Sequence, residues 1–254
     1  MRIFDPMKIA IHFPVYKRVK IRNIAMDCLD RVRADFARLG IETEVCVIGD
    51  DKDLPAVCEA RGYHHFQVEN KPLGRKFEMG LRWMLRHLEF DYMMEFCSDN
   101  ILRKDYPTLM AKALKDGHQW VAHDQFYIVD SVTGKTHLFN KRGQSNVGRC
   151  TSRKLIEASQ KHLNRCYDYE LMSGLDAAFR TNISRCTDRL TYLLKTPTPL
   201  IIDIKSQTNI NMFSGFARKP EVFPPTEVVG DFPELSQLKH FNTLDHGNNG
   251  ENSL

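Results

Sequence analysis

The sequence predicts an α/β fold with a mostly parallel central sheet, and three observations carry this prediction. Apolar runs of strand length alternate with longer amphipathic segments through the first half of the chain. Such alternation is typical of parallel strands joined by right-handed helical crossovers. Turn-forming polar residues follow three of the apolar runs. The chain has 254 residues, which is enough for one large α/β domain with a sizeable core.

Each element of the first half follows from its own pattern. The run 8–13 is apolar, and Pro14 ends it because proline cannot donate to a strand ladder. Apolar residues then fall four apart over 20–39, which predicts an amphipathic helix that stops at Gly40. The run 92–97 is mostly apolar, as suits a strand covered on both faces, and it leads into an acidic turn. The other expected elements are a strand at 44–48, a short helix at 54–61, a weaker strand at 64–68 and a helix at 74–88.

The second half of the sequence changes character. The segments 125–129 and 135–139 flank a turn that contains Gly134, which predicts an antiparallel hairpin. We expect one domain over 1–220, with halves at 8–100 and 101–220. The extension 221–254 is rich in Pro, Gly and Asn and is expected to be partly disordered. Further helices are expected at 109–114, 152–162 and 171–183, and further strands at 120–123, 190–194 and 200–204.

Composition is that of an ordinary globular protein, with 42% hydrophobic and 27% charged residues. The seven cysteines are scattered singly and show no zinc or redox spacing, so reduced thiols in a cytoplasmic compartment are expected. No apolar run approaches the ~18–20 residues of a membrane span, so no membrane partner is expected. The net charge of +4 permits a polyanionic partner without demanding one. Trp83 and Trp120 are expected in the core.

Three polar clusters follow expected strands, at the point where each strand ends. The clusters are 14–18, 50–53 and 98–100. In a parallel sheet they project from the same edge, which is where open α/β sheets bind their ligands. There, Tyr16 could stack on a nucleobase, and Asp50 or Asp51 could accept a hydrogen bond from the same nucleobase. Asp99 offers a hard oxygen to a divalent cation that carries phosphates.

In the order and spacing of these motifs, the sequence resembles the nucleotide-sugar-dependent glycosyltransferases of the GT-A fold, in their family 2-like branch. The resemblance covers roughly residues 8–205. It rests on the Pro-x-Tyr exit of the first strand, the pair Asp50-Asp51, the segment Asn-Lys-Pro-Leu-Gly-Arg-Lys at 70–76, and the turn Ser-Asp-Asn at 98–100. It implies a single GT-A-like domain, with a nucleotide-binding half at 8–100 and an acceptor half at 101–220.

The resemblance also implies a role for each matching residue. In the family, the aspartate pair contacts the nucleobase, and an Asp-x-Asp motif binds manganese or magnesium on the diphosphate. Here Cys97 stands at the first position of that motif, so Asp99 is its only carboxylate and metal ligand. Asp176, shortly after Gly174, matches the general base of inverting members, although a first-turn aspartate of a helix is the structural alternative. The implied donor-binding residues are Pro14, Tyr16, Arg18, Asp50, Asp51, Arg75, Lys76, Ser98, Asp99 and Lys205.

The predicted reaction is transfer of a sugar from a nucleotide donor, expected to be a UDP-sugar, to an acceptor hydroxyl. The compact size and mild basic charge are similar to those of small bacteriophage-type transferases that glycosylate modified pyrimidines in DNA. The expected acceptor is therefore either DNA that carries a modified pyrimidine or a glycan.

Three alternatives stay open from the sequence. A nucleotidyltransferase with a similar sheet would need a glycine-rich loop after the first strand, whereas 14–18 contains no glycine. A non-catalytic nucleic-acid-binding protein would need denser clusters of basic residues between exposed aromatic side chains. Asp99 and Asn100 could also serve only to cap a helix that begins near Pro107.

Overall fold

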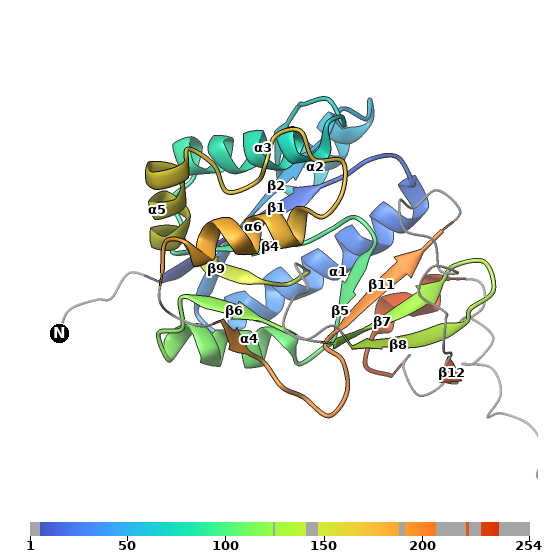
Figure 1. The fold of residues 1–254 in the computed structure, drawn as a ribbon. Coiled ribbons are helices and arrows are strands. Elements are labelled where there is room, and N and C mark those ends of the chain that lie inside the picture. Colours follow the sequence, from blue (N-terminus) through green and yellow to red (C-terminus); the bar gives the residue numbers. More distant parts are fainter. Residues whose placement is uncertain are drawn as a thin grey trace, which may run out of the picture.

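A computed structural model of the chain describes residues 6–123, 125–140, 147–187, 191–206, 222–223 and 230–238. It contains a seven-stranded sheet with helices on both faces and a second, five-stranded sheet beside it (Figure 1). The strand order is β10-β6-β9-β4-β1-β2-β3 in the first sheet and β12-β8-β7-β11-β5 in the second. The predicted α/β class is confirmed.

The first sheet is built on four parallel strands. β1 (Met7–Pro14) pairs with β2 (Ile41–Ile48) on one side and with β4 (Tyr92–Glu95) on the other. β3 (His64–Phe66) extends the sheet beyond β2. Because these strands run in one direction, the turns that follow them all lie at one edge.

Helices cover both faces of this sheet, which explains why its strands read as nearly continuous apolar runs. One face packs against α1 (Val19–Arg38), α2 (Leu54–Arg61) and α4 (Tyr106–Lys115). The other face packs against α3 (Leu73–His87), α5 (Arg153–Leu163) and α6 (Leu175–Ser184) (Figure 1).

The second half of the chain adds strands to the same sheet. β9 (Cys150–Ser152) is antiparallel to β4 on one side and to β6 (Trp120–Ala122) on the other. β10 (Tyr192–Leu193) pairs with β6 in parallel. The central sheet is therefore mostly parallel, with one antiparallel strand inserted in it.

The predicted hairpin is confirmed and belongs to the second sheet. β7 (Gln125–Asp130) and β8 (Thr136–Asn140) are antiparallel, and Gly134 adopts a φ of 71° in the turn between them. β11 (Ile201–Lys205) joins β7 to β5 (Asn100–Leu102), and β12 (Val222–Phe223) pairs with β8.

The helix-cap interpretation of Asp99 and Asn100 is wrong. Asn100 begins β5, and the residue that precedes α4 is Asp105. The turn 97–99 therefore connects a strand of one sheet to a strand of the other, and Asp99 lies where the two sheets meet.

Part of the expected C-terminal extension packs on the core. A 3-10 helix, η1 (Pro233–Gln237), lies against α1, where Arg31 Nε is 2.6 Å from a carboxylate oxygen of Glu234. Phe232 and Leu235 are buried beside it. The residues 239–254 lie outside the described part. Among the helices that the structure describes, none combines the length and apolarity needed to cross a membrane.

Buried His12, in the middle of β1, makes stability depend on pH. Its Nε2 lies 2.9 Å from the carbonyl oxygen of Phe77, and its ring stacks at 5.9 Å on Tyr167. Burial lowers the pKa of His12 from its ordinary value of 6.5 to about 4. Between these two pH values the unfolded chain binds more protons than the folded chain. The unfolding free energy should therefore fall by roughly 3 kcal/mol as the pH drops through this window.

Urea unfolding of the wild type and of His12→Gln between pH 7 and pH 4 checks this expectation. The variant has no group at this position that titrates, so its stability should change less steeply with pH, whatever its stability at pH 7. An equal slope for both proteins would assign the pH dependence to other groups.

Candidate active site

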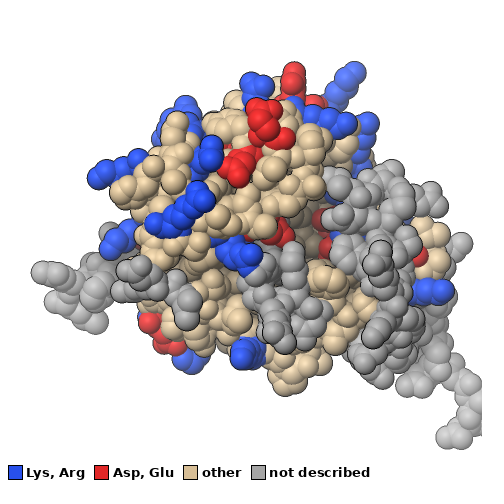
Figure 2. Space-filling view, in the orientation of Figure 1, with Lys and Arg blue, Asp and Glu red and all other residues tan. Residues whose placement is uncertain are grey.

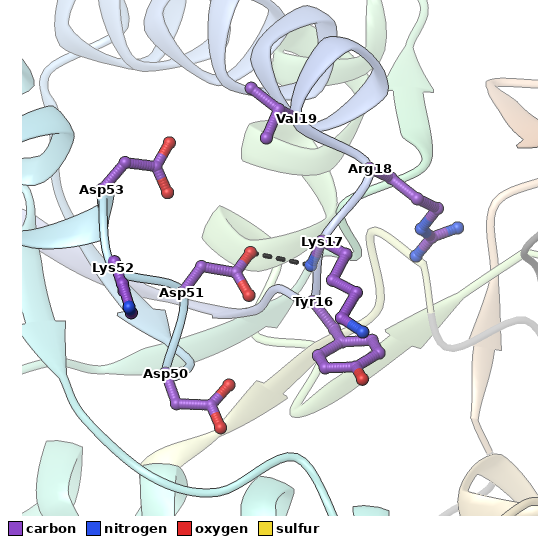
Figure 3. A pocket seen from close by; sticks show the side chains of 8 residues that line it. All are labelled: Tyr16, Lys17, Arg18, Val19, Asp50, Asp51, Lys52 and Asp53. Atoms are coloured by element: carbon purple, nitrogen blue, oxygen red, sulfur yellow. Dashed lines mark hydrogen bonds between the residues drawn. The ribbon is translucent and has the colours of Figure 1, made fainter.

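A cavity of about 460 Å³ opens at the carboxyl edge of the parallel strands (Figure 3). It lies between the turn that follows β1 and the turn that follows β2. The three carboxylates of the second turn stand on one side in Figure 3, and the aromatic and basic side chains of the first turn stand on the other. Its lining residues are Tyr16, Lys17, Arg18, Val19, Asp50, Asp51, Lys52 and Asp53.

The turn after β1 has an unusual backbone that its neighbours stabilise. Lys17 and Arg18 both adopt left-handed conformations, with φ of 52° and 51°. Non-glycine residues rarely do so, and the conformation costs free energy that surrounding contacts must offset. The backbone N–H of Lys17 donates to the Asp51 carboxylate at 2.7 Å. Arg18 donates to Asp99 at 2.8 Å and to the Ser98 hydroxyl at 3.1 Å.

These contacts join the three polar clusters that the sequence placed at one edge. Arg18 comes from the first cluster, and its partners Ser98 and Asp99 come from the third. Pro14 is the last residue of β1, and its register partner is Ile48 at the end of β2. The expected convergence of the clusters is therefore present in the structure.

The three aspartates of the second cluster differ in availability. Asp51 accepts from Lys17 and from the buried guanidinium of Arg22, which also binds Asp53 at 3.1 Å. Asp51 thus holds the two turns together. Asp50 is exposed, and within the described part of the chain no hydrogen bond or ion pair is recorded for its side chain. Asp53 is exposed as well but is paired with Arg22, so Asp50 is the carboxylate of this cluster that is most available to a ligand.

Lys76 and Arg75 are neighbours in sequence but face different surfaces. Lys76 is buried, and its Nζ donates to the carbonyl oxygen of Val15 and, at 3.0 Å, to the Asn70 side chain. Burial lowers the pKa of Lys76 to about 8. Arg75 is exposed and lines a separate cavity on α3, because successive helix residues point about 100° apart. The structure thus places Arg75 away from the cavity at the strand edge, where we expected it.

A second polar group lies behind Asp99. Lys205 Nζ is 2.5 Å from the Asp203 carboxylate, and the backbone N–H of Ile204 donates to the Asp99 carbonyl at 2.7 Å. Burial raises the pKa of Asp203; the Lys205 ammonium opposes this rise and the Asp99 carboxylate adds to it. Two cations, from Arg18 and Lys205, therefore alternate with two carboxylates at the junction of the sheets.

The carboxylates at this junction can coordinate a divalent cation only if phosphate oxygens or water complete its shell. Among the residues that the structure describes, no three His, Cys, Asp or Glu side chains converge as a metal site. Magnesium, however, is commonly held by one or two carboxylates together with phosphate oxygens and water. Asp99 and Asp203 supply two such carboxylates, whereas the Cys97 thiol is a poor ligand for a hard cation.

Beneath this layer lies a buried network that the sequence analysis missed. The Arg149 guanidinium donates to Glu95 at 2.5 Å, and the Tyr167 hydroxyl donates to the other oxygen of the same carboxylate. Arg149 also lies over the ring of Phe179 at 4.2 Å. The signal for this network was Glu95 itself, a single charge inside an apolar run, which folding can bury only beside a partner.

The candidate base lies close to this network. Asp176 is in the first turn of α6, after Gly174 with its φ of 72°. Burial raises the pKa of Cys97 well above its ordinary value, and the carboxylates of Asp99 and Asp176 add to the rise. Asp176 also acts electrostatically on Arg149. Asp176 is therefore near enough to Cys97 and Arg149 to influence the pKa of both side chains.

The strand order, the hairpin sheet and the edge pocket define a GT-A-like α/β fold. Solved structures with a similar fold include several of TarS of S. aureus. TarS 1-349 is 20% identical with a TM-score of 0.53, over 78% of this chain and 60% of that one. Its complex with UDP-GlcNAc is 18% identical with a TM-score of 0.54, over 93% and 72%. Its complex with UDP is 19% identical with a TM-score of 0.51, over 79% and 61%.

At these identities the likeness establishes the fold. The chain spans 37% of the longer TarS chain of known structure. No family profile matches the sequence, and no curated protein matches it.

Proposed function

We propose that this protein transfers a sugar from a nucleotide-sugar donor to an acceptor hydroxyl. The observation that carries the proposal is the pocket at the strand edge, where an aromatic ring, an available carboxylate and basic side chains surround one cavity. TarS, which shares the fold, has been solved with UDP-GlcNAc and with UDP, and this supports a UDP-sugar as the donor here.

The pocket residues divide into those that suit a base and those that suit a diphosphate. The Tyr16 ring is 36% exposed and can stack on a nucleobase, while Asp50 can accept a hydrogen bond from its edge. Arg18 and Lys205 carry positive charge beside Asp99 and can neutralise the diphosphate. Lys76 holds the carbonyl of Val15 and so positions the turn that carries the Tyr16 ring.

Asp99 and Asp203 would hold a manganese or magnesium ion against the donor phosphates. When bound, such an ion supplies Lewis acidity to the leaving diphosphate. Arg18, which donates to one oxygen of the Asp99 carboxylate, lies beside this position and can contribute positive charge to the phosphates.

Asp99→Asn tests this assignment. We expect a loss of roughly 10- to 100-fold in kcat/KM for the donor, with Asp203 retaining part of the binding. Manganese binding in the presence of UDP, measured by calorimetry, should weaken in parallel. Asp116→Asn, which removes a carboxylate at the end of α4, is the matched control. A manganese titration unchanged by Asp99→Asn would leave Asp99 with a structural role only.

The proposed acceptor is a hydroxyl on a modified base in DNA or on a glycan, with Asp176 as the general base. A panel of nucleotide sugars, assayed for release of the nucleoside diphosphate with and without acceptor, tests the whole proposal. We expect one UDP-sugar to be hydrolysed and to raise the unfolding temperature. If no nucleotide sugar is hydrolysed and none raises the unfolding temperature, the proposal is wrong. Nucleotidyl transfer, or nucleic-acid binding without catalysis, would then be the functions to test.

A further inference from the structure

A second cavity, of about 410 Å³, lies on the outer surface of α3, and we name it the α3 groove. It is separate from the donor pocket, and the two cavities share no lining residue. Its lining combines positive charge with aromatic rings. The residues used below are Phe66, Arg75, Arg82, Trp83, Arg86 and Tyr169.

The three arginines form one row along the helix. Arg75, Arg82 and Arg86 are seven and four residues apart, so all three project from the same face of α3. Arg82 is already engaged, with its Nε 2.8 Å from the buried Glu78 carboxylate. Arg75 and Arg86 are exposed, and no ion pair involving either is recorded in the part of the chain that the structure describes.

The distance between the two available arginines limits the ligand. Arg86 lies eleven positions after Arg75 in the helix, which corresponds to about 16 Å along the axis. When both side chains extend straight out from the helix, one phosphate group is too small to contact both guanidinium groups, so a ligand that contacts both carries several anionic groups in a row. A repeating phosphodiester chain has this property.

The aromatic rings lie between the charges. Trp83 stacks against Phe66 with ring centroids 6.0 Å apart and still remains partly exposed in the groove. Tyr169 faces the Arg82 guanidinium at 5.7 Å. Proteins that bind single-stranded nucleic acid combine a positively charged groove with aromatic side chains on which bases stack.

The groove is connected to both parts of the proposed active site. Tyr169 belongs to the loop that leads into α6 and Asp176, and this loop is docked on α3. The N–H of Gly74 donates to the Leu171 carbonyl at 2.8 Å, and a Cβ at position 74 would lie 1.8 Å from the Asp168 carbonyl oxygen. Only glycine allows this approach. One turn of α3 thus carries the donor-side Lys76 and the groove-side Arg75.

We propose that the α3 groove binds a single-stranded stretch of nucleic acid, with phosphates on Arg75 and Arg86 and bases against Trp83 and Tyr169. This inference deepens the proposed function, because it selects nucleic acid as the acceptor class and assigns it a path towards Asp176.

The test measures binding without any donor, so it is independent of sugar transfer. Fluorescence anisotropy of a labelled single-stranded oligothymidylate compares the wild type with Arg75→Ala/Arg86→Ala. The matched control is Lys112→Ala/Lys115→Ala, which removes two exposed charges from α4 on the opposite face of the sheet. We expect about tenfold weaker binding for the groove variant at low salt and less than about twofold for the control. The logarithm of the association constant falls as the logarithm of the salt concentration rises. In the groove variant this negative slope should be shallower by about 1.4, because two phosphate contacts are lost.

A second variant separates base stacking from general attraction of anions. Tyr169→Leu keeps the apolar packing but removes the aromatic ring, and it should weaken oligonucleotide binding at least about fivefold. Inorganic polyphosphate should compete poorly. Equal binding by the groove variant and the control would overturn the proposal. So would equal competition by polyphosphate together with wild-type binding by Tyr169→Leu, because the groove would then attract any polyanion. Donor hydrolysis that fails while oligonucleotide binding behaves as expected would reject the transfer reaction and keep the groove.

Discussion

Replacing Asp176 with asparagine is expected to lower kcat by ~10²–10⁴-fold while leaving the KM for the donor little changed. Asparagine keeps the size and much of the hydrogen bonding of aspartate, but it cannot take a proton from the acceptor hydroxyl as a carboxylate does. The donor pocket, by contrast, is built from the turns after β1 and β2, which do not include α6. The loss should therefore fall on the chemical step.

Steady-state kinetics with the preferred donor, together with thermal unfolding, measure this effect. Glu170→Gln, in the loop before α6, is the control, since it removes a nearby exposed carboxylate. A folded Asp176→Asn enzyme whose kcat stays within a few-fold of the wild type would remove Asp176 as the base. That result would favour a retaining reaction, which needs no base at this place.

The second large effect concerns stability. Glu95 and Arg149 are 1% and 2% exposed, and their ion pair is buried under the active-site layer. Arg149→Met should reduce the free energy of unfolding by about 3–5 kcal/mol, because it leaves the Glu95 carboxylate buried with Tyr167 as its remaining partner. Burial already raises the pKa of Glu95, while Arg149 and Tyr167 oppose that rise. Loss of Arg149 should raise this pKa further.

Urea unfolding of single and double variants measures this cost. Glu95→Leu combined with Arg149→Met removes both charges, so the double variant should recover much of the stability that Arg149→Met loses. A single Arg149→Met substitution that costs less than about 1 kcal/mol would show that the pair is solvated or easily replaced. The coupling energy from the double-mutant cycle separates these outcomes.

The sequence predicted the parallel part of the sheet well, because β1 and β2 are eight residues long and turn-forming polar residues follow β1, β2 and β4. The turn residues Tyr16, Asp50 and Asp99 follow from that pattern, since parallel strands bring their ends to one edge. β5 and β9 have three residues each, too few for a period to be recognised, and so the junction of the two sheets stayed hidden.

Side-chain direction was the harder part to predict. Trp83 was expected in the core, yet it is partly exposed in the α3 groove. Arg75 and Lys76 stand side by side in a basic stretch, and only the phase of the helix decides which is buried. Similarly, the pairing of Arg18 with Asp99 depends on the left-handed conformations of Lys17 and Arg18. The sequence does not predict these conformations, because neither residue is glycine.

The insertion of β9 between β4 and β6 has a consequence for anyone who wishes to recombine this protein with other proteins of the same fold. A crossover at residue 100 looks natural from the sequence, because it divides the expected nucleotide-binding half from the expected acceptor half. In the folded chain such a crossover would part β4 from its neighbour β9 and separate Asp99 from its hydrogen-bond partner Ile204. A block that starts at β4 would likewise part β4 from β1 and Asp99 from Arg18, so a chimaera intended to change the proposed acceptor choice should confine the exchange to the loop that joins α5 to α6.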